Sequence, residues 1–290
     1  MNHSMINSLV SMQGLQQKLD IVANNMANLN TTGYKRKDAS FHDVLTTTMR
    51  QPGTFEQVGR LSPLGLTQGW GAKLSQIQTI LAQGSLKQTD RPTDLAIEGD
   101  ALFEVIVPSV DGAGQPVQQT AWTRDGAFSL KAQPDDPDNV YLTTQEGHLV
   151  LGTDDLPIRV PNHSRIKVET NGAITAYSEL DPTQPPVTVG ALKLVQVVRP
   201  QLLQNRGDNL YSLPETIDPA LGDVLRVVAF DAANPEAAKV KVQQGFLEQS
   251  NVNMTEEMTE LMMTQRAFQL NAKALASADT MMSLANSLRG

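Results

Sequence analysis

Cysteine is absent from the 290-residue chain, and aromatic residues make up only 4% of it. The absence of cysteine excludes disulfide bonds, thiolate metal sites and a cysteine nucleophile. It suits a protein whose stability does not depend on the redox state of its compartment. The shortage of aromatic residues argues against a carbohydrate-binding or base-stacking surface.

Positive charge is also in the minority, with 23 Lys and Arg against 31 Asp and Glu, a net charge of −8 and a pI near 5.0. This balance argues against binding to nucleic acid or to an anionic membrane surface. No run approaches the roughly 18 apolar residues of a membrane span. The first 20 residues lack the basic and apolar regions of a cleaved signal peptide. We therefore expect no nucleic-acid partner, no membrane insertion and no cleaved signal.

Motifs of catalysis are lacking too. His3, His42, His148 and His163 show no metal-ligand spacing, and the sequence contains no HExxH, GxSxG or Walker motif. Residues 112–117 (GAGQPV) are expected to form a turn, because they lack the third glycine of a dinucleotide fingerprint. A glycosidase with paired carboxylates stays open, although nothing selects a pair. The sequence predicts no enzyme, no cofactor and no metal site.

Methionine, by contrast, is concentrated at the two ends. All eleven methionines lie within residues 1–49 and 254–282. Because methionine fills irregular gaps and adapts to variable surfaces, this distribution indicates that the ends serve a different purpose from the middle.

Both ends show helical periodicity. Apolar residues recur at alternating steps of three and four residues, a pattern typical of coiled coils. The stripes are Met5, Leu9, Met12, Leu19, Ala23 and Met26 at one end, and Met254, Met258, Leu261, Phe268, Ala272, Leu275 and Met282 at the other. They predict helices over roughly 4–29 and 255–288. Ser4 is expected to cap the first, and Asn253 with Glu256 to form a capping box on the second.

The faces opposite these stripes carry almost no charge: Lys18 and Asp20 are the only charged residues in 1–33. A helix that is apolar or amide-bearing on all sides is expected to be buried on all sides, and a neutral amide is buried at a lower cost than a charge. Burial of both helices in one large domain is the alternative. The expected assembly interface comprises Met5, Leu9, Met12, Leu19, Val22, Asn24, Asn25, Met26, Asn28, Leu29, Met258, Leu261, Gln265, Phe268, Leu275, Met282 and Leu288.

The chain is expected to leave the first helix through a turn at Asn30 and Gly33, since glycine readily adopts the left-handed conformation that ends many helices. Residues 34–36 (Tyr-Lys-Arg) would then open a solvated arm. The Pro- and Gly-rich stretch that follows is too long for an ordinary loop, and we expect an extended arm or a long hairpin.

The middle of the chain has short alternating runs separated by Gly, Pro, Asn and Asp, which favour an antiparallel β domain. The acidic run 135–139 is expected to be an exposed loop. The predicted fold class is α+β. Its domains are a terminal helical, coiled-coil domain (1–33 and 250–290), an extended connecting arm (34–93 and 232–249) and a central antiparallel all-β domain (94–231).

One short sequence occurs twice. Residues 83–90 (QGSLKQTD) are echoed by residues 244–251 (QGFLEQSN). One copy precedes the β domain and the other precedes the C-terminal helix, so we expect a pair of related turn-and-strand units at these two places.

Several stretches of the chain carry a family resemblance. These are residues 23–35 (ANNMANLNTTGYK), 93–105 (TDLAIEGDALFEV), 123–130 (TRDGAFSL) and three C-terminal segments, 245–253, 265–273 and 285–288. With them the chain resembles the bacterial flagellar rod and hook proteins. Residues 50–53 (RQPG) and 61–71 resemble the arm of the distal-rod type. Ala101 and Leu102 depart from the family's usual Gly-Phe pair, and the acidic loop at 133–139 is longer.

The resemblance implies a structural axial subunit of the flagellar basal body, which assembles into a hollow helical rod without a cofactor and without catalysis. It implies export through the flagellar export apparatus without a cleaved signal, and polymerisation with copies of itself and with neighbouring rod and hook proteins. The alternatives are another rod or hook protein of the family, a coiled-coil stalk that presents a β domain to glycan, and a cell-wall hydrolase.

Overall fold

The computed structural model describes residues 2–43, 46–49, 66–69, 71–110, 116–133, 136–178, 185–214, 224–228, 230 and 240–288. The chain divides into two compact units. The first comprises residues 1–27, 37–78 and 253–290, and the second comprises residues 28–36 and 79–252. Each unit is described separately.

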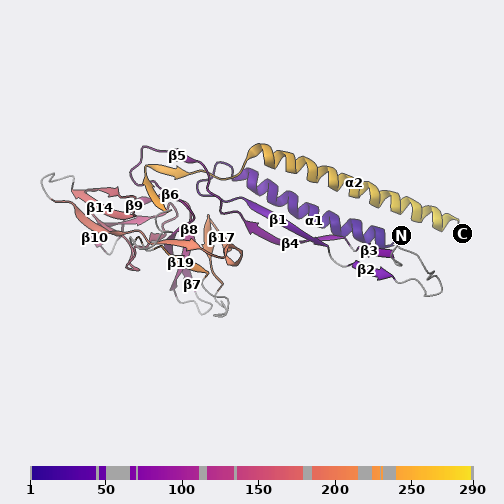
Figure 1. Ribbon diagram of the computed structural model, residues 1–290, viewed down its shortest axis with the longest axis horizontal. Helices are drawn as coiled ribbons and strands as arrows, with labels where there is room; N and C mark the ends of the chain where they lie inside the picture. Colours follow the sequence, from indigo (N-terminus) through magenta and orange to yellow (C-terminus); the bar gives the residue numbers. More distant parts are fainter. Residues whose placement is uncertain are drawn as a thin grey trace, which may run out of the picture. The chain divides into compact units, whose positions relative to one another are not determined.

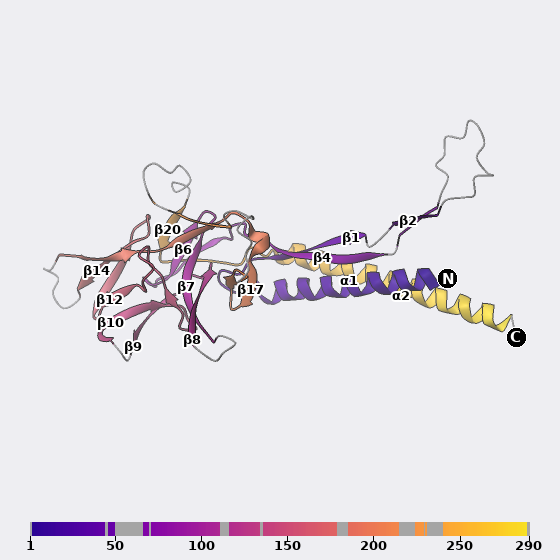
Figure 2. The same cartoon turned by 90° about the horizontal axis from the view of Figure 1, so that it is seen from below.

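The first unit contains the two long helices and two short β ladders. Its elements are α1 (Asn2–Ala27), β1 (Lys37–Asp43), β2 (Thr46–Met49), β3 (Leu66–Gly69), β4 (Ala72–Thr79) and α2 (Met254–Ser287). The helices predicted at roughly 4–29 and 255–288 are therefore present, within two residues at each end. They lie side by side along the length of α1 (Figures 1 and 2). They run antiparallel, because Asn25 lies beside Glu257 and Met5 shares a hollow with Leu275.

The two helix starts differ from each other in how well they were predicted. Asn253 precedes α2 as expected: its side chain accepts a hydrogen bond of 3.0 Å from the Thr255 amide and donates one of 3.2 Å to Glu256. Glu256 and Glu257 in the first turn favour the positive end of the helix dipole. The predicted cap at Ser4 is wrong, because α1 already begins at Asn2 and Ser4 lies inside it.

The arm predicted after the first helix contains paired strands. β1 pairs with β4, and β2 pairs with β3 in antiparallel register. The ladder covers one side of α1: the Asn7 amide donates a 2.7 Å hydrogen bond to the Gly69 carbonyl, and Gly14 faces the ring of Phe41. The arm therefore belongs to the helical unit as far as Gln78. Residues 50–65, which carry most of the resemblance to the distal-rod arm, lie outside the described residues.

The second unit is the central antiparallel β region. Its strands are β5 (Leu86–Gln88), β6 (Leu95–Glu98), β7 (Leu102–Val110), β8 (Pro116–Thr123), β9 (Ser129–Gln133), β10 (Asp136–Thr143), β11 (Leu149–Val150), β12 (Arg159–Pro161), β13 (Ser164–Val168), β14 (Ala173–Ser178), β15 (Val187–Ala191), β16 (Leu194–Val197), β17 (Gln204–Gly207), β18 (Leu210–Ser212), β19 (Leu225–Val227), β20 (Lys241–Gln244) and β21 (Phe246–Glu248), with a short 3₁₀ helix, η2, at Pro200–Leu202.

Within the described residues these strands form a ten-stranded antiparallel sheet, a three-stranded sheet β13-β14-β15 and the pairs β6–β20 and β5–β21. The core lies between them, where Phe103 packs edge-on against Phe128 with ring centroids 5.0 Å apart. A smaller cluster holds Leu102, Trp122, Val195 and Tyr211. Burial of these apolar side chains is the main contribution to the stability of the unit.

Two sequence expectations for this unit need comment. Residues 136–139 of the acidic run belong to β10, with Asn139 opposite Pro161, so the predicted loop does not extend over them. The echoed octapeptides, in contrast, pair with each other, because β5 and β21 form an antiparallel ladder with Leu86 opposite Glu248 and Lys87 opposite Leu247. The two copies are thus related by an approximate local two-fold axis.

Candidate functional site

The helix pair buries small and polar side chains between its two members. On α1 the positions that face α2 or are buried follow steps of three and four residues: Ser8, Ser11, Leu15, Lys18, Val22 and Asn25. On α2 the wholly buried side chains are Glu257, Thr264 and Ala278. The face of α1 that packs against α2 therefore lies one position away from the apolar stripe seen in the sequence. Asn25 and Lys18 form polar contacts with α2 on this inner face.

A polar cluster fixes one end of this pair. The Asn25 side-chain amide donates hydrogen bonds to Glu257 Oε2 at 3.2 Å and to the Lys37 carbonyl at 2.9 Å, and its oxygen accepts one from the Lys37 amide at 3.0 Å. Asn25 and Glu257 are almost inaccessible to solvent. Further along, Lys18 Nζ lies 2.6 Å from Glu260 Oε1. These contacts define the relative register of α1, α2 and β1.

Large apolar side chains remain on the outside of the same pair. Most of them are on α2, since the β1–β4 ladder covers one side of α1, whereas α1 is the main described element in contact with α2. The exposed set is Ile6 and Leu9 on α1, and Met254, Met258, Met262, Met263, Leu270, Met281, Leu284 and Leu288 on or just after α2. A helix whose outer face is apolar marks an interaction surface.

The predicted interface residues fall into three groups. Val22 and Asn25 are buried within the chain. Half-buried positions are Met5, Met12, Leu19, Met26, Asn28, Leu29, Leu261, Phe268, Leu275 and Met282, and exposed positions are Leu9, Asn24, Met258, Gln265 and Leu288. Of the residues predicted for the exit turn, Asn30 is exposed and Gly33 is buried.

Gly33 sits in the second unit with φ of +67°, in the left-handed region that favours glycine. A Cβ atom there would lie 2.5 Å from the Asp125 amide nitrogen. The Gly33 amide donates a 2.9 Å hydrogen bond to the Glu248 carbonyl. The turn is therefore held closely against the β region by backbone contacts.

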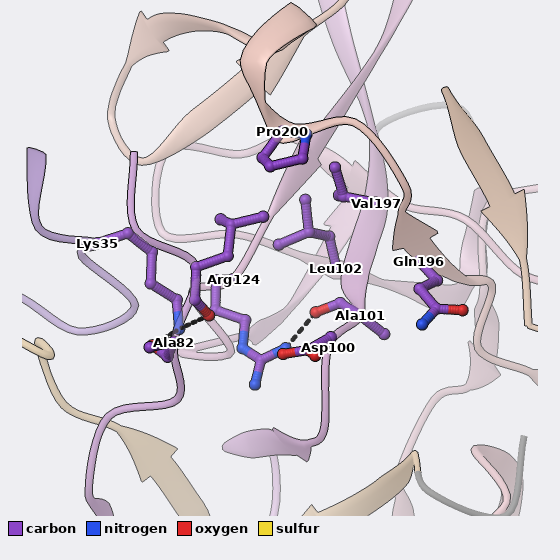
Figure 3. Close-up of a pocket in the computed structure, with 10 residues that line it drawn as sticks. Lys35, Ala82, Asp100, Ala101, Leu102, Arg124, Gln196, Val197 and Pro200 are labelled. Atoms are coloured by element: carbon purple, nitrogen blue, oxygen red, sulfur yellow. Dashed lines mark hydrogen bonds between the residues drawn. The ribbon is translucent and has the colours of Figure 1, made fainter. Parts of the chain in front are cut away.

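A buried ion-pair cluster lies next to this turn. Lys35 Nζ donates to Glu248 Oε1 at 2.7 Å and to the carbonyls of Leu81 and Ala82 at 3.2 and 2.9 Å. Arg124 donates from Nε to the same carboxylate, and from its other nitrogens to the carbonyls of Ala101 and Ile97. Lys35, Arg124 and Asp100 are among the residues that line a cavity of about 320 Å³, and Figure 3 shows these side chains.

The prediction that residues 34–36 open a solvated arm is wrong for Tyr34 and Lys35, which are almost wholly buried. A Gly-Tyr-Lys-Arg sequence is typical of an exposed segment. The desolvation of the ammonium group is offset here by Glu248, 213 residues further along the chain, and by the Leu81 and Ala82 carbonyls. Sequence reasoning missed all three members of the cluster. The resemblance of residues 123–130 and 245–253 to family motifs was the one signal that could have pointed to Arg124 and Glu248.

Electrostatics within the cluster are strongly coupled. Burial would raise the pKa of the Glu248 carboxyl, but Arg124 and Lys35 outweigh that effect and hold its pKa below the usual value. Burial and the neighbouring Arg124 lower the pKa of Lys35, although Glu248 opposes this. The cluster thus joins Lys35, Arg124 and Glu248, which come from three separate segments of the second unit.

Three family models match successive parts of the chain. They are described as "Flagella basal body rod protein" (residues 10–35), "Flagellar hook protein FlgE/F/G D1 domain" (residues 96–176) and "Flagellar basal body rod FlgEFG protein C-terminal" (residues 243–288). Among curated relatives, the flagellar basal-body rod protein FlgG of Borreliella burgdorferi is 32% identical, over 96% of this chain and 95% of its own length. The chain belongs to the flagellar basal-body rod protein family.

Two further relatives of this rod protein family are similar to the chain along nearly its whole length. FlgG of Buchnera aphidicola is 33% identical over 96% of the chain and 98% of its own length. The flagellar hook-basal body complex protein FlhP of Bacillus subtilis is 33% identical over the full length of both. The family consists of structural proteins rather than enzymes.

The described residues contain no group of three or more His, Asp or Glu side chains placed to hold a metal ion. Neither α1 nor α2 is long and apolar enough to span a membrane.

Proposed function

We propose that this rod-family chain is an axial subunit of the flagellar basal-body rod, of the distal type, that polymerises through its terminal helices. One observation carries the proposal: the helix pair buries Ser8, Asn25 and Glu257 inside the chain and leaves large apolar side chains such as Met258 and Leu270 outside. That is the reverse of what an isolated helix pair requires. The similarity to FlgG over nearly the full length supports the assignment to the rod.

Hydrophobic burial would drive polymerisation. Complete burial of a Leu or Met side chain contributes on the order of 1.5–3 kcal/mol. The ten exposed apolar side chains of the pair are mostly about half exposed, so covering them would contribute on the order of 10 kcal/mol. This is comparable with the loss of subunit freedom on association, which costs about 4–15 kcal/mol.

Coiled-coil pairing between terminal helices belongs to the same proposal. The steps of three and four residues along the inner face of α1 are those of a heptad repeat. The predicted stripe on α1 lies next to that inner face and is partly accessible: Leu9 is exposed, and Met5 and Met12 are half-buried. On α2, Met258 of the predicted stripe is exposed as well. We propose that helices of neighbouring subunits occupy this second face, so that each α1–α2 pair is one part of a larger bundle.

Location and export are proposed from family membership. The chain would leave the cytoplasm through the flagellar export apparatus without a cleaved signal, and would contact neighbouring rod and hook proteins as well as its own copies. In this proposal the terminal helical domain makes the contacts between subunits, and the β domain and the arm contact other subunits. The domain boundaries are those of the two compact units.

The test is polymerisation of concentrated full-length protein, followed by negative-stain electron microscopy. We expect tubes or filaments from the native chain and loss of them in Met258→Glu and Leu270→Glu, whose side chains are exposed. Gln17→Glu, also on an exposed helix position, is the matched control that should still polymerise. Discrete particles of uniform size from the native chain, such as trimers, would contradict an axial role and favour a stalk-like binding module.

A further inference from the structure

The C-terminal end of α2 extends past its partner helix. Met5, Ile6 and Leu9 of α1 lie beside residues 272–279 of α2, and α1 begins at Asn2. Beyond this level α2 continues to Ser287, which the ribbon shows as a free end (Figures 1 and 2). We call Met281–Leu288 the tail.

The tail is apolar and accessible. Met281 is 52%, Leu284 is 62% and Leu288 is 87% exposed, whereas Met282 is half-buried. No charged residue occurs between Thr280 and Leu288. A single helical segment of this length is not stable by itself in water, because it lacks a packed apolar face.

The same helix pair offers an apolar hollow just before the tail begins. The hollow has a volume of about 450 Å³ and is lined by Met5, Ile6, Leu9, Ala272, Leu275, Ala276 and Asp279. Ala272 and Ala276 are one turn apart on α2 and leave room for side chains from outside. Asp279 is the only charged group in the lining, and it stands at the end of the hollow nearest the tail.

We propose that the tail of one copy of this chain lies in the hollow of a second copy. The inference rests on the proposed polymerisation and names the contact that produces it. A tail without charge can enter a lining that is almost entirely apolar, and Asp279 at one end is the one charged lining group whose hydration the contact would affect. Leu284 is the residue that the hollow would accept, since it is the exposed leucine in the middle of the tail.

This contact has a direction. The tail and the hollow are different parts of the surface, so the contact is heterologous. Repeated from copy to copy, such a contact gives an open helical filament, or a ring if the rotation between copies closes. The middle of the tail is about nine residues beyond the middle of the hollow along α2. At about 1.5 Å per residue, adjacent copies would be offset by about 14 Å along the helix axis.

Disulfide trapping tests the contact directly, because the native chain has no cysteine. Leu9→Cys and Leu284→Cys, carried by separate copies of different mass, are mixed under polymerising conditions and oxidised. We expect a mixed disulfide dimer, since Cα atoms within about 7 Å can be bridged. Gln17→Cys, on an exposed position of α1 outside the hollow, replaces Leu9→Cys in the control. Equal yields with the control, or no mixed dimer, would overturn the contact.

A second experiment separates this contact from the proposed function. Leu284→Asp with Leu288→Asp changes only exposed positions, so the monomer should keep its circular dichroism and its unfolding temperature. We expect at least a tenfold increase in the protein concentration needed for polymerisation. Polymerisation that is unchanged in this variant would overturn the tail contact alone. Failure of the native chain to polymerise would overturn the proposed function and the contact with it.

Discussion

The Lys35 ammonium group donates a 2.7 Å hydrogen bond to the Glu248 carboxylate, and both side chains are almost wholly buried. Lys35 lies in a nine-residue segment, 28–36, that the chain inserts into the second unit between α1 and β1. Glu248 ends β21 and also accepts hydrogen bonds from Arg124 and from the Gly84 amide, the latter at 2.7 Å. One carboxylate therefore connects the start, the middle and the end of the unit.

Glu248→Gln should strongly destabilise the second unit. The substitution keeps the size of the side chain but removes the negative charge that two buried cations share. Breaking a buried ion pair in this way typically costs about 3–5 kcal/mol. Urea unfolding followed by tryptophan fluorescence measures the loss, because Trp122 lies in this unit. Glu169→Gln, at an exposed position, is the control and should change the free energy of unfolding by less than about 0.5 kcal/mol.

The same carboxylate predicts a pH dependence. The pKa of Glu248 is lowered in the folded chain, so the unfolded chain binds more protons in the acid range and stability falls as pH falls. The contribution is fully present above the ordinary glutamate pKa of about 4.3 and is lost as pH passes below the folded value. Burial raises the pKa of Asp125, which acts in the opposite direction. Between pH 7 and pH 3, the free energy of unfolding should therefore fall more steeply with decreasing pH in Asp125→Asn than in the native chain. The fall should be smaller in Glu248→Gln. A free energy of unfolding that does not change over this range in the native chain would contradict the lowered pKa of Glu248.

Gly33→Ala should be more harmful than the same change at another left-handed glycine. At Gly33 a Cβ atom meets the Asp125 backbone at 2.5 Å, whereas at Gly207, with φ of +102°, none of the described atoms lies within 4 Å. Both substitutions incur the backbone strain of a non-glycine residue, about 1–2 kcal/mol, but only Gly33→Ala adds a steric clash with main-chain atoms. Thermal unfolding of the two variants side by side measures the difference. Equal losses would mean that the exit turn is not packed as described.

Asn25→Ala should loosen the helix pair within a single chain. The change removes a hydrogen bond to the buried Glu257 carboxylate and two to the Lys37 backbone. A cost of about 1–3 kcal/mol is expected for the polar groups left in the interior. Amide hydrogen exchange along α1 in the monomer reports the effect, with Gln17→Ala as the exposed control. If exchange in the monomer is unchanged, Asn25 acts only between subunits, as the sequence alone had predicted.

Oxidation of methionine should inhibit polymerisation. Peroxide converts the thioether to a sulfoxide, which is polar and poorly accommodated in an apolar contact. Met263, 61% exposed, should oxidise faster than the half-buried Met282, which peptide mass spectrometry can measure. A variant with Leu at Met258, Met262 and Met263 should polymerise normally after the same treatment. Equal inhibition of that variant would show that the oxidised residues responsible lie elsewhere.

The sequence predicted the helices well because their periodicity is long, and the cap at Asn253 is a local signal. It predicted the stripe that contains Met5, Leu9 and Met12 as part of an assembly interface, and the face of α1 that packs on α2 lies one position away from this stripe. Apolar residues point to a core in a monomer, but here Ser8 and Asn25 face inward, and the larger Leu9 is left for another contact. Residues 112–117 were expected to form a turn, but Pro116 and Val117 already belong to β8. The ion-pair cluster could not be predicted from local pattern, since its members are separated by up to 213 residues.

The antiparallel pairing of β5 with β21 has a mechanical consequence. Residue 86 lies opposite residue 248, so the chain segments that lead to the terminal-helix unit, 79–85 and 249–252, leave this ladder from the same end. Tension transmitted along the backbone therefore pulls both strands in the same direction. Such a load neither shears the ladder nor peels one strand from the other, and the ladder passes it as one element to the strands behind it.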